Sequence, residues 1–308
     1  MSTPKVLPKS LGLKKGILLA GGTGSRLYPT TLAVNKHLLP VYDKPLIYYP
    51  LTTLMLAGVT EILVVSGTKD VHALKAVLGD GKQWGLSITY ATQAAPNGIA
   101  DGILIGADFI NGQPFVLILG DTIFIGHGFA PVLRDASQRS KGRATIFTYW
   151  VADPSSYGVV QVDANKTPVK LIEKPKTTIS HRAIPGLYFY DDRAVRFARS
   201  LLPSKRNELE ITDLNQIYLE DRTLEVIHLG RGFVWFDAGT TQNLLSAAQL
   251  VETLQSRQRM GIAFPEEVAY RTKLISFDDF TSLVQAMPKC AYREYLENLK
   301  SEILEGVE

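Results

Sequence analysis

Short apolar runs alternate with helical patterns through the first half of this chain, and this alternation limits the folds it can adopt. Four runs read as β-strands: Lys15–Ala20, Glu61–Ser66, Ser87–Thr92 and Phe115–Leu119. The stretches Ile62–Val65 and Val116–Leu119 are continuously apolar, which is typical of strands buried on both faces. Strands that alternate with helices build a parallel sheet covered by helices on both sides. We therefore predict an α/β fold.

The pattern changes at residue 144. Closely spaced strand-like runs follow: Ala144–Trp150, Tyr157–Val162, Val169–Ile172 and Leu187–Tyr190. Helical spacing returns further on, at Glu208–Glu220, Thr240–Gln258, Phe277–Ala286 and Tyr292–Leu304. We predict one domain over residues 14–308: a Rossmann-like, mostly parallel mixed sheet flanked by helices (14–143), a smaller β-rich part (144–240) and a C-terminal helical part (241–308). Residues 1–13 contain no apolar segment, so we expect a disordered tail.

The composition argues against several functional classes. The chain has 33 Lys plus Arg against 30 Asp plus Glu, a net charge of +3, so neither nucleic acid nor a membrane surface is an expected partner. No apolar run approaches the roughly 20 residues that span a bilayer. The single cysteine, Cys290, excludes an intramolecular disulfide and fits a reducing compartment. We expect a cytoplasmic protein.

A glycine-rich loop follows the first strand and carries an arginine. The segment from Gly16 to Leu27 reads G-I-L-L-A-G-G-T-G-S-R-L. Three glycines leave backbone N–H groups open to an anion, and Arg26 adds a charge that can bind phosphate: Gly21, Gly22 and Gly24. The segment lacks the Lys-Ser or Lys-Thr of a Walker loop, and Leu27 stands where a dinucleotide-binding loop has its third glycine. A tight turn without a ligand is the alternative, which Arg26 and Lys36 disfavour.

Two aspartates are candidate metal ligands. Asp121 directly follows the buried strand Val116–Gly120, at the edge of the sheet where ligands bind in such folds. Asp237 lies at a second strand–loop–helix junction. Two carboxylates, together with phosphate oxygens and water, suit octahedral Mg²⁺. Each aspartate alone is more typical of a helix cap or turn, and their spacing does not show that they meet.

Three further positions could bind a phosphorylated sugar. The pair Glu173 and Lys174 offers a hydroxyl acceptor beside a cation, or forms a solvated strand end. Arg206 lies near the predicted helix 208–220, whose N-terminus also favours an anion, or it is an ordinary surface arginine. Tyr157 could stack on a sugar or pack as a strand aromatic.

An ordered set of motifs resembles one family over residues 14 to the C-terminal helices. The motifs are Leu19–Pro29, Asn35–Pro40, Leu46–Pro50, Gly79–Gly85, Leu119–Phe124, Tyr157–Val160, Glu173–Pro175, Gly186–Asp191, Glu208–Asp213 and Trp235–Thr240. Together they are similar to those of the bacterial glucose-1-phosphate thymidylyltransferases, and so many motifs in order are more specific than any one of them.

The resemblance implies a reaction and a set of site residues. Glucose 1-phosphate would attack the α-phosphorus of dTTP, giving dTDP-glucose and pyrophosphate. The implied catalytic cations are Arg26, Lys36, Lys174 and Arg206, and the implied Mg²⁺ ligands are Asp121 and Asp237. The implied nucleotide contacts are Gly21, Gly22, Thr23, Gly24, Ser25, Arg26, Gln93, Gly98 and Asp121. The implied sugar-phosphate contacts are Tyr157, Gly158, Glu173, Lys174, Arg206 and Trp235.

The resemblance also implies a homotetramer with feedback inhibition by a downstream dTDP-sugar. Four positions depart from the family pattern: Asp101 stands for Gln, Thr122 for Asn, Pro185 for Thr and Asn207 for Gly. Because Asp101 and Thr122 neighbour the implied base and metal contacts, UTP or another sugar 1-phosphate remains an alternative substrate. A non-catalytic sugar-nucleotide-binding regulatory protein is the alternative from another class, and an NAD-dependent oxidoreductase comes third.

Overall fold

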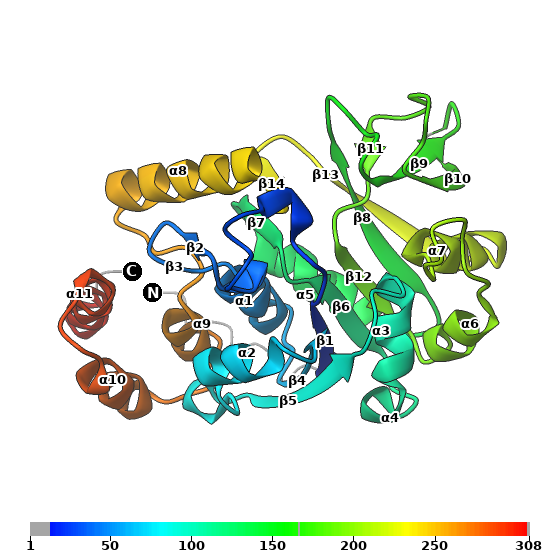
Figure 1. Ribbon diagram of the computed structural model, residues 1–308. Coiled ribbons are helices and arrows are strands. Elements are labelled where there is room, and N and C mark those ends of the chain that lie inside the picture. Colours follow the sequence, from blue (N-terminus) through cyan, green and yellow to red (C-terminus); the bar gives the residue numbers. More distant parts are fainter. Residues whose placement is uncertain (1–12, 166, 307–308) are drawn as a thin grey trace.

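A computed structural model describes residues 13–165 and 167–306 of the chain, so all but the last residue of the expected N-terminal tail lies outside the described residues. A ten-stranded sheet runs through the molecule (Figure 1). Its strands are β1 (Lys15–Ala20), β4 (Glu61–Gly67), β5 (Ser87–Gln93), β6 (Phe115–Leu119), β8 (Ala144–Trp150), β9 (Gly158–Val162), β10 (Pro168–Glu173), β11 (Arg182–Ala183), β12 (Leu187–Tyr190) and β13 (Leu224–Leu229).

Two small antiparallel pairs complete the strands. They are the hairpin β2 (Pro40–Val41) with β3 (Lys44–Pro45), and β7 (Thr122–Gly126) with β14 (Phe233–Asp237). The helices are α1 (Tyr48–Leu56), α2 (Val71–Leu78), α3 (Ile99–Ile105), α4 (Ala107–Ile110), α5 (Phe129–Arg139), α6 (Ala194–Ser200), α7 (Ile211–Glu220), α8 (Thr241–Gln258), α9 (Pro265–Arg271), α10 (Phe277–Ala286) and α11 (Ala291–Glu305). Short 3₁₀ turns are η1 (Ser25–Leu27), η2 (Lys36–Leu38) and η3 (Lys82–Trp84).

The strand order predicts a ligand-binding crevice beside β1. The chain passes from β1 to β4 and β5 on one side, then returns to β6 on the other side of β1. All four strands are parallel, so their carboxyl ends share one edge. In open α/β sheets, ligands bind at the carboxyl edge where the strand order reverses. Here that point lies between β1 and β6.

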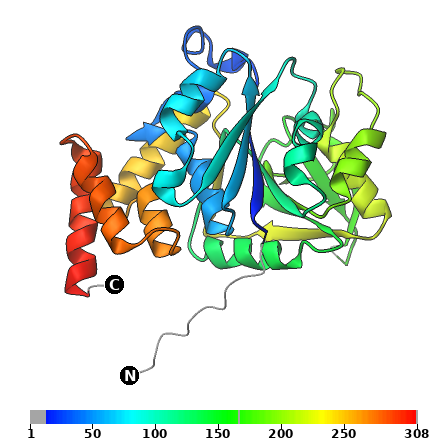
Figure 2. The same ribbon diagram turned by 90° about the horizontal axis from the view of Figure 1, so that it is seen from below.

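Helices cover both faces of the sheet because successive strand residues point to opposite sides. Leu18 of β1 packs in a buried cluster with residues of α1, α2 and α5. Its neighbour Ile17 packs in a second cluster with residues of α3, α6 and α7. Figure 2 shows α1 and α2 on one side of the sheet and α6 and α7 on the other. The predicted α/β fold is confirmed.

The predicted parts 14–143 and 144–240 contribute strands to the same sheet. Strand β12 pairs antiparallel with both β6 and β8, and β13 lies parallel to β8. The expected boundary at residue 143/144 therefore falls within one continuous sheet, and the three-part division stays a prediction. Helices α10 and α11 lie at the end of the molecule opposite β9 and β10 (Figure 1).

Several elements differ from the expectation. Strands β7, β13 and β14 were not among the predicted runs, although Asp237 does end a strand as expected. The helix predicted from Glu208 begins at Ile211, and residues Glu208 to Glu210 belong to the loop before it. Among residues 13–165 and 167–306, we find no helix with the length and apolar character needed to span a membrane.

Candidate active site

The glycine-rich loop connects β1 to the one-turn helix η1 at the crevice beside β6. Gly22 has φ 97° and Gly24 has φ 61°, backbone angles that favour glycine. A Cβ at Gly24 would also lie 2.8 Å from the side chain of Thr31. Because η1 is a single 3₁₀ turn, an anion at this loop would depend on the exposed loop backbone and on Arg26.

Arg26 reaches from this loop to the end of β14. Its Nη2 lies 3.7 Å from Oδ2 of Asp237, and its side chain is 55% exposed. Gly239 allows this path, since a Cβ there would lie 2.5 Å from Arg26 Nη2. The guanidinium is therefore positioned by the strand pair β7–β14 and remains accessible to a bound phosphate.

Lys36 begins η2 and points under the glycine loop. Its Nζ donates to Oδ2 of Asp121 at 2.5 Å, and both side chains are largely buried. The Asn35 side chain caps η2 by accepting from the backbone N–H of His37 at 2.8 Å. A Cβ at Gly22 would lie 3.9 Å from Lys36 Nζ, so the ammonium is next to the loop backbone.

The two candidate metal ligands do come together. Asp237 pairs with Thr122 across β7–β14, and the backbone N–H of Ala238 donates to the carbonyl of Asp121 at 2.8 Å. Burial is the largest influence on the pKa of Asp121 and raises it, but the charge of Lys36, followed by His37 and by hydrogen bonds to the carboxylate, together leave the pKa below its usual value. Burial, and next the charge of Asp121, raises the pKa of Asp237.

This donor set fits a hard divalent cation. The two carboxylates are close enough for the charge of Asp121 to raise the pKa of Asp237, and each lies beside one cationic side chain. Mg²⁺ is usually held by one or two carboxylates plus substrate phosphates. In the part of the chain that the structure describes, no larger cluster of His, Cys, Asp or Glu could hold a metal ion. Asp121 and Asp237 stay the candidate ligands.

A second cluster surrounds Glu173. Its Oε2 accepts from the hydroxyl of Thr212 at 2.5 Å, and its Oε1 lies 3.8 Å from Nζ of Lys174. A Cβ at Gly158 would lie 2.7 Å from Thr212 Oγ1, so only glycine leaves this space open. Thr212 was not predicted as a site residue, although it lies within the quoted motif 208–213.

Arg206 lies in a turn shortly before the start of α7, near a helix start as expected. Its Nη2 makes contacts that the sequence did not predict, with Glu210 at 2.7 Å, Glu208 at 3.1 Å and Glu173 at 3.5 Å. These carboxylates hold the pKa of Arg206 above its usual value, chiefly through the hydrogen bond with Glu210. The reason is local: three acidic side chains converge on one guanidinium.

Aromatic residues connect the two clusters. The rings of Tyr157 and Trp235 lie 5.0 Å apart at 62°. Burial, and next the charge of Asp237, raises the pKa of Tyr157, which places this ring near the first cluster. The indole Nε1–H of Trp235 is buried and has no hydrogen-bond partner within the described residues. It is a donor that a bound hydroxyl or phosphate oxygen could satisfy.

Gln93 and Gly98 lie on the other side of the glycine loop. Gln93 ends β5, and its Nε2 donates to Oδ2 of Asp101 at 2.8 Å and to the carbonyl of Gly98 at 3.3 Å. Gly98 has φ 104°, and a Cβ there would lie 2.4 Å from the carbonyl of Leu209. The sequence did not predict the contact between Gln93 and Asp101. Its only signal was that Asp101 departs from the family pattern.

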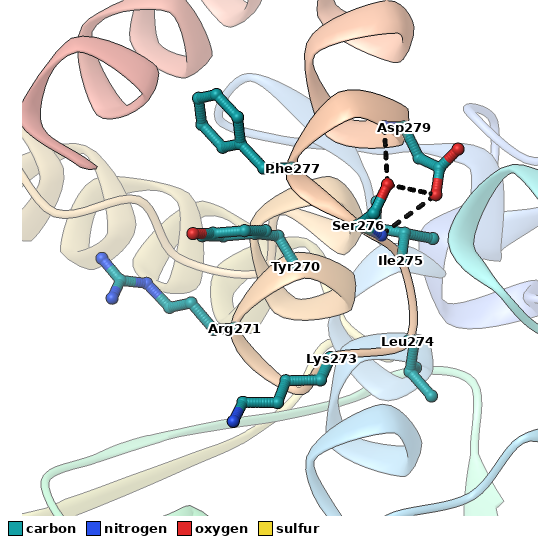
Figure 3. A pocket seen from close by; sticks show the side chains of 8 residues that line it. All are labelled: Tyr270, Arg271, Lys273, Leu274, Ile275, Ser276, Phe277 and Asp279. Carbon is teal, nitrogen blue, oxygen red and sulfur yellow. Dashed lines mark hydrogen bonds between the residues drawn. The ribbon is translucent and has the colours of Figure 1, made fainter. Parts of the chain in front are cut away.

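A cavity of about 600 Å³ lies away from this crevice, between α9 and α10 (Figure 3). Three of its polar side chains are already paired: Ser276 and Asp279 form a capping box at the start of α10, and Arg271 donates to Glu267 at 2.7 Å. The catalytic candidates lie elsewhere. The charged side chains beside the glycine loop therefore remain the candidate active site.

Comparison with known proteins bears on this arrangement. A family model described as nucleotidyl transferase matches residues 15–253. The chain belongs to the nucleotidyl transferase family. All the candidate site residues, from the glycine loop to Asp237, lie within the matched range.

The names of relatives of this nucleotidyl transferase agree with the family assignment. The chain is 49% identical to a glucose-1-phosphate thymidylyltransferase of Neisseria meningitidis over 285 residues, 92% of this chain and 99% of the relative. It is 48% identical to one of Xanthomonas campestris over 286 residues, 93% of this chain and 97% of the relative. A crystal structure of a Bacillus anthracis protein assigned as a glucose-1-phosphate thymidylyltransferase, in complex with sucrose, has a TM-score of 0.71 and 38% identity, and covers 77% of this chain and 94% of that one.

The resemblance stated from the motifs is confirmed by these relatives. The expectation of an enzyme that transfers a nucleotidyl group is confirmed as well. None of these comparisons favours a non-catalytic binding protein or an NAD-dependent oxidoreductase.

Proposed function

We propose that this nucleotidyl transferase transfers a thymidylyl group from dTTP to glucose 1-phosphate. One observation carries the proposal: Arg26 and Lys36 converge with Asp121 and Asp237 beside the glycine loop, in a chain whose curated relatives bear this enzyme name. The proposed nucleotide contacts are the loop residues 21–26 with Gln93, Gly98 and Asp121.

The reaction needs charge neutralisation rather than a base. A phosphate oxygen of glucose 1-phosphate attacks the α-phosphorus, the bond to the bridging oxygen of the β-phosphate breaks, and pyrophosphate leaves. The nucleophile is already an anion, so no proton has to be removed. Arg26 and Lys36 bind the triphosphate and stabilise the charge that develops on the leaving pyrophosphate. A Mg²⁺ ion held by Asp121 and Asp237 would supply further charge neutralisation at the phosphates.

The second cluster is proposed to hold the sugar phosphate. Glu173 accepts hydroxyl hydrogen bonds, with Tyr157, Gly158 and Trp235 as the walls of the pocket. Lys174 is 43% exposed and is the cation available for the phosphate. Arg206 contacts three carboxylates, so we expect it to position Glu173 and to bind phosphate only after its side chain moves.

A direct assay tests the proposed reaction. The protein is incubated with dTTP, glucose 1-phosphate and Mg²⁺, and pyrophosphate release is measured against a reaction without enzyme. We expect release that depends on all three components. No release above that background would contradict the proposal. The same assay with UTP and with other sugar 1-phosphates ranks the substrates by kcat/KM.

We further propose a homotetramer that works in the cytoplasm and is inhibited by a downstream dTDP-sugar. The support for assembly is the family resemblance, together with large apolar side chains that are about half exposed: Tyr42 (47%), Leu245 (51%) and Met260 (55%). Light scattering at assay concentration tests assembly, and a monomer would contradict it. Turnover that is unchanged in saturating dTDP-rhamnose would count against the inhibition.

A further inference from the structure

The side-chain amide of Gln93 is held in one orientation by its neighbours. Its Nε2 has two partners, the carboxylate of Asp101 at 2.8 Å and the backbone carbonyl of Gly98 at 3.3 Å. A carbonyl and an ionised carboxylate can only accept hydrogen bonds. The amino end of the amide must therefore face these two groups, since the opposite orientation would bring oxygen against oxygen. The bond to Asp101 is charge-assisted and is the stronger of the two.

The other end of the amide faces the glycine-rich loop. Gln93 Oε1 would lie 3.3 Å from a Cβ built on Gly21, so the oxygen is directed at the loop where the nucleotide is proposed to bind. Gly98 is held in place because the backbone groups of Asn97 and Ala100, on either side of it, hydrogen-bond to Leu209 at 2.7 and 3.2 Å. The loop side of Gln93 thus presents an acceptor and no donor.

We propose that Asp101 is a positioning residue that locks Gln93 with its carbonyl oxygen toward the nucleotide, and that this lock selects bases with an N3–H donor. The inference rests on the proposed function, in which Gln93 reads the base. Thymine and uracil carry N3–H and can donate to Gln93 Oε1. Cytosine has an unprotonated N3, so two acceptors would face each other and lose their hydrogen bonds to water.

The family resemblance implies a Gln at position 101, where this chain has Asp101. A glutamine at 101 can accept or donate, so it permits both orientations of Gln93. A carboxylate permits one. We therefore expect this enzyme to reject dCTP strongly.

The test compares Asp101→Asn with the parent enzyme, using dTTP and dCTP in parallel. The ratio of kcat/KM for dTTP over dCTP is expected to fall about tenfold or more, through a higher KM for dTTP and a lower KM for dCTP. The kcat with dTTP stays within about threefold, because the phosphate-binding residues are untouched. Asp101→Gln is the second variant in case Asp101→Asn does not fold. Asp108→Asn removes the same charge from an exposed position on α4 and is the matched control.

A merely structural role for Asp101 predicts a different result. The variants would then unfold at lower temperature and lose activity with both nucleotides alike, leaving the ratio unchanged, and this would overturn the inference. Equilibrium binding of dTTP and dCTP, with Mg²⁺ and without sugar phosphate, separates this result from failure of the proposed function. If no nucleotide is turned over, the proposed reaction is wrong, and the binding ratio of the parent and Asp101→Asn proteins still decides the role of Asp101.

Discussion

At the scale of single residues, the active site is a set of charges that neutralise one another before substrate arrives. Lys36 pairs with Asp121, and Arg26 lies near Asp237. Like charges meet in this buried setting, and the cost appears in the raised pKa of Asp237, caused first by burial and then by Asp121. When substrate and a metal ion bind, the phosphates would pair with Arg26 and Lys36. The metal ion would bind Asp121 and Asp237, in place of the present ion pairs.

Replacing Lys36 tests whether this lysine stabilises negative charge during the reaction. In Lys36→Met, the triphosphate loses a charge and Asp121 loses its partner. We expect kcat for pyrophosphate release to fall roughly 10²–10³-fold, the range seen when one charge-stabilising donor is removed. Steady-state kinetics with dTTP and glucose 1-phosphate measure this. Lys141→Met, at an exposed loop position, is the control, and equal activity in the two variants would argue against a catalytic Lys36.

Replacing Asp237 tests metal binding. In Asp237→Asn, we expect divalent-ion affinity to fall by at least about tenfold, since changes even to the outer partners of metal ligands cost about 10–100-fold. Calorimetric titration of Mn²⁺ in the presence of dTTP measures it. Because ionised Asp237 is disfavoured in the metal-free protein, the variant should unfold at a higher temperature than the parent in EDTA. Asp192→Asn, at an exposed position, should change neither quantity.

At the scale of elements, close approach of β1, β6 and η2 builds the crevice. The backbone N–H of Gly120 donates to the carbonyl of Leu19 at 2.8 Å, which extends the pairing beyond β6. A Cβ at Gly120 would lie 2.5 Å from the ring of His37 and 2.8 Å from the Leu19 carbonyl oxygen. Glycine is therefore needed directly before Asp121, because any side chain would push η2 and its lysine away.

Gly120→Ala tests this packing. We expect the free energy of unfolding to fall by about 1–3 kcal/mol, as in other overpacked sites, and activity to fall with it because Lys36 and Asp121 separate. Urea unfolding and the pyrophosphate assay measure the two effects. Gly230→Ala is the control, since nothing lies within 4 Å of a Cβ there. If both variants are equally stable, the packing at Gly120 does not matter.

At the scale of the whole molecule, His37 couples the stability of the fold to pH. Burial, and next the charge of Lys36, lowers the pKa of His37 to about 3. An unfolded histidine titrates near 6.5, so the unfolded chain takes up a proton that the folded protein refuses. The neutral, buried His37 therefore makes its full contribution to stability above about pH 6.5, and this contribution is lost as the pH falls toward about 3.

The measurement is urea unfolding in metal-free buffer between pH 7.5 and 5. We expect the free energy of unfolding to decline with a slope that approaches about 1.4 kcal/mol per pH unit from this histidine. His37→Gln has no such proton to bind, so its stability should depend less on pH. Parallel pH profiles for the two proteins would show that His37 does not act in this way.

Local patterns in the chain were enough to predict much of the fold. Strands β1, β6, β8 and β12 have the predicted bounds, because runs rich in apolar, β-branched and aromatic residues are local signals. Strands β7 and β14 were missed, since they pair only with each other, across more than 100 residues of chain, and lie outside the main sheet. Such pairing depends on the tertiary fold and leaves no periodicity to read.

The same division holds for the site. The amino-acid sequence by itself determined which groups are present: the glycine loop with its arginine, the lysine after Asn35, the two aspartates and the family to which the chain belongs. Only the tertiary structure decided which groups meet. Asp121 joins Asp237 through β7–β14, Arg206 contacts carboxylates, and Asp101 orients Gln93. Charges and hydrogen bonds act over a few ångströms in space, and the number of residues between two groups does not say how far apart they lie in the fold.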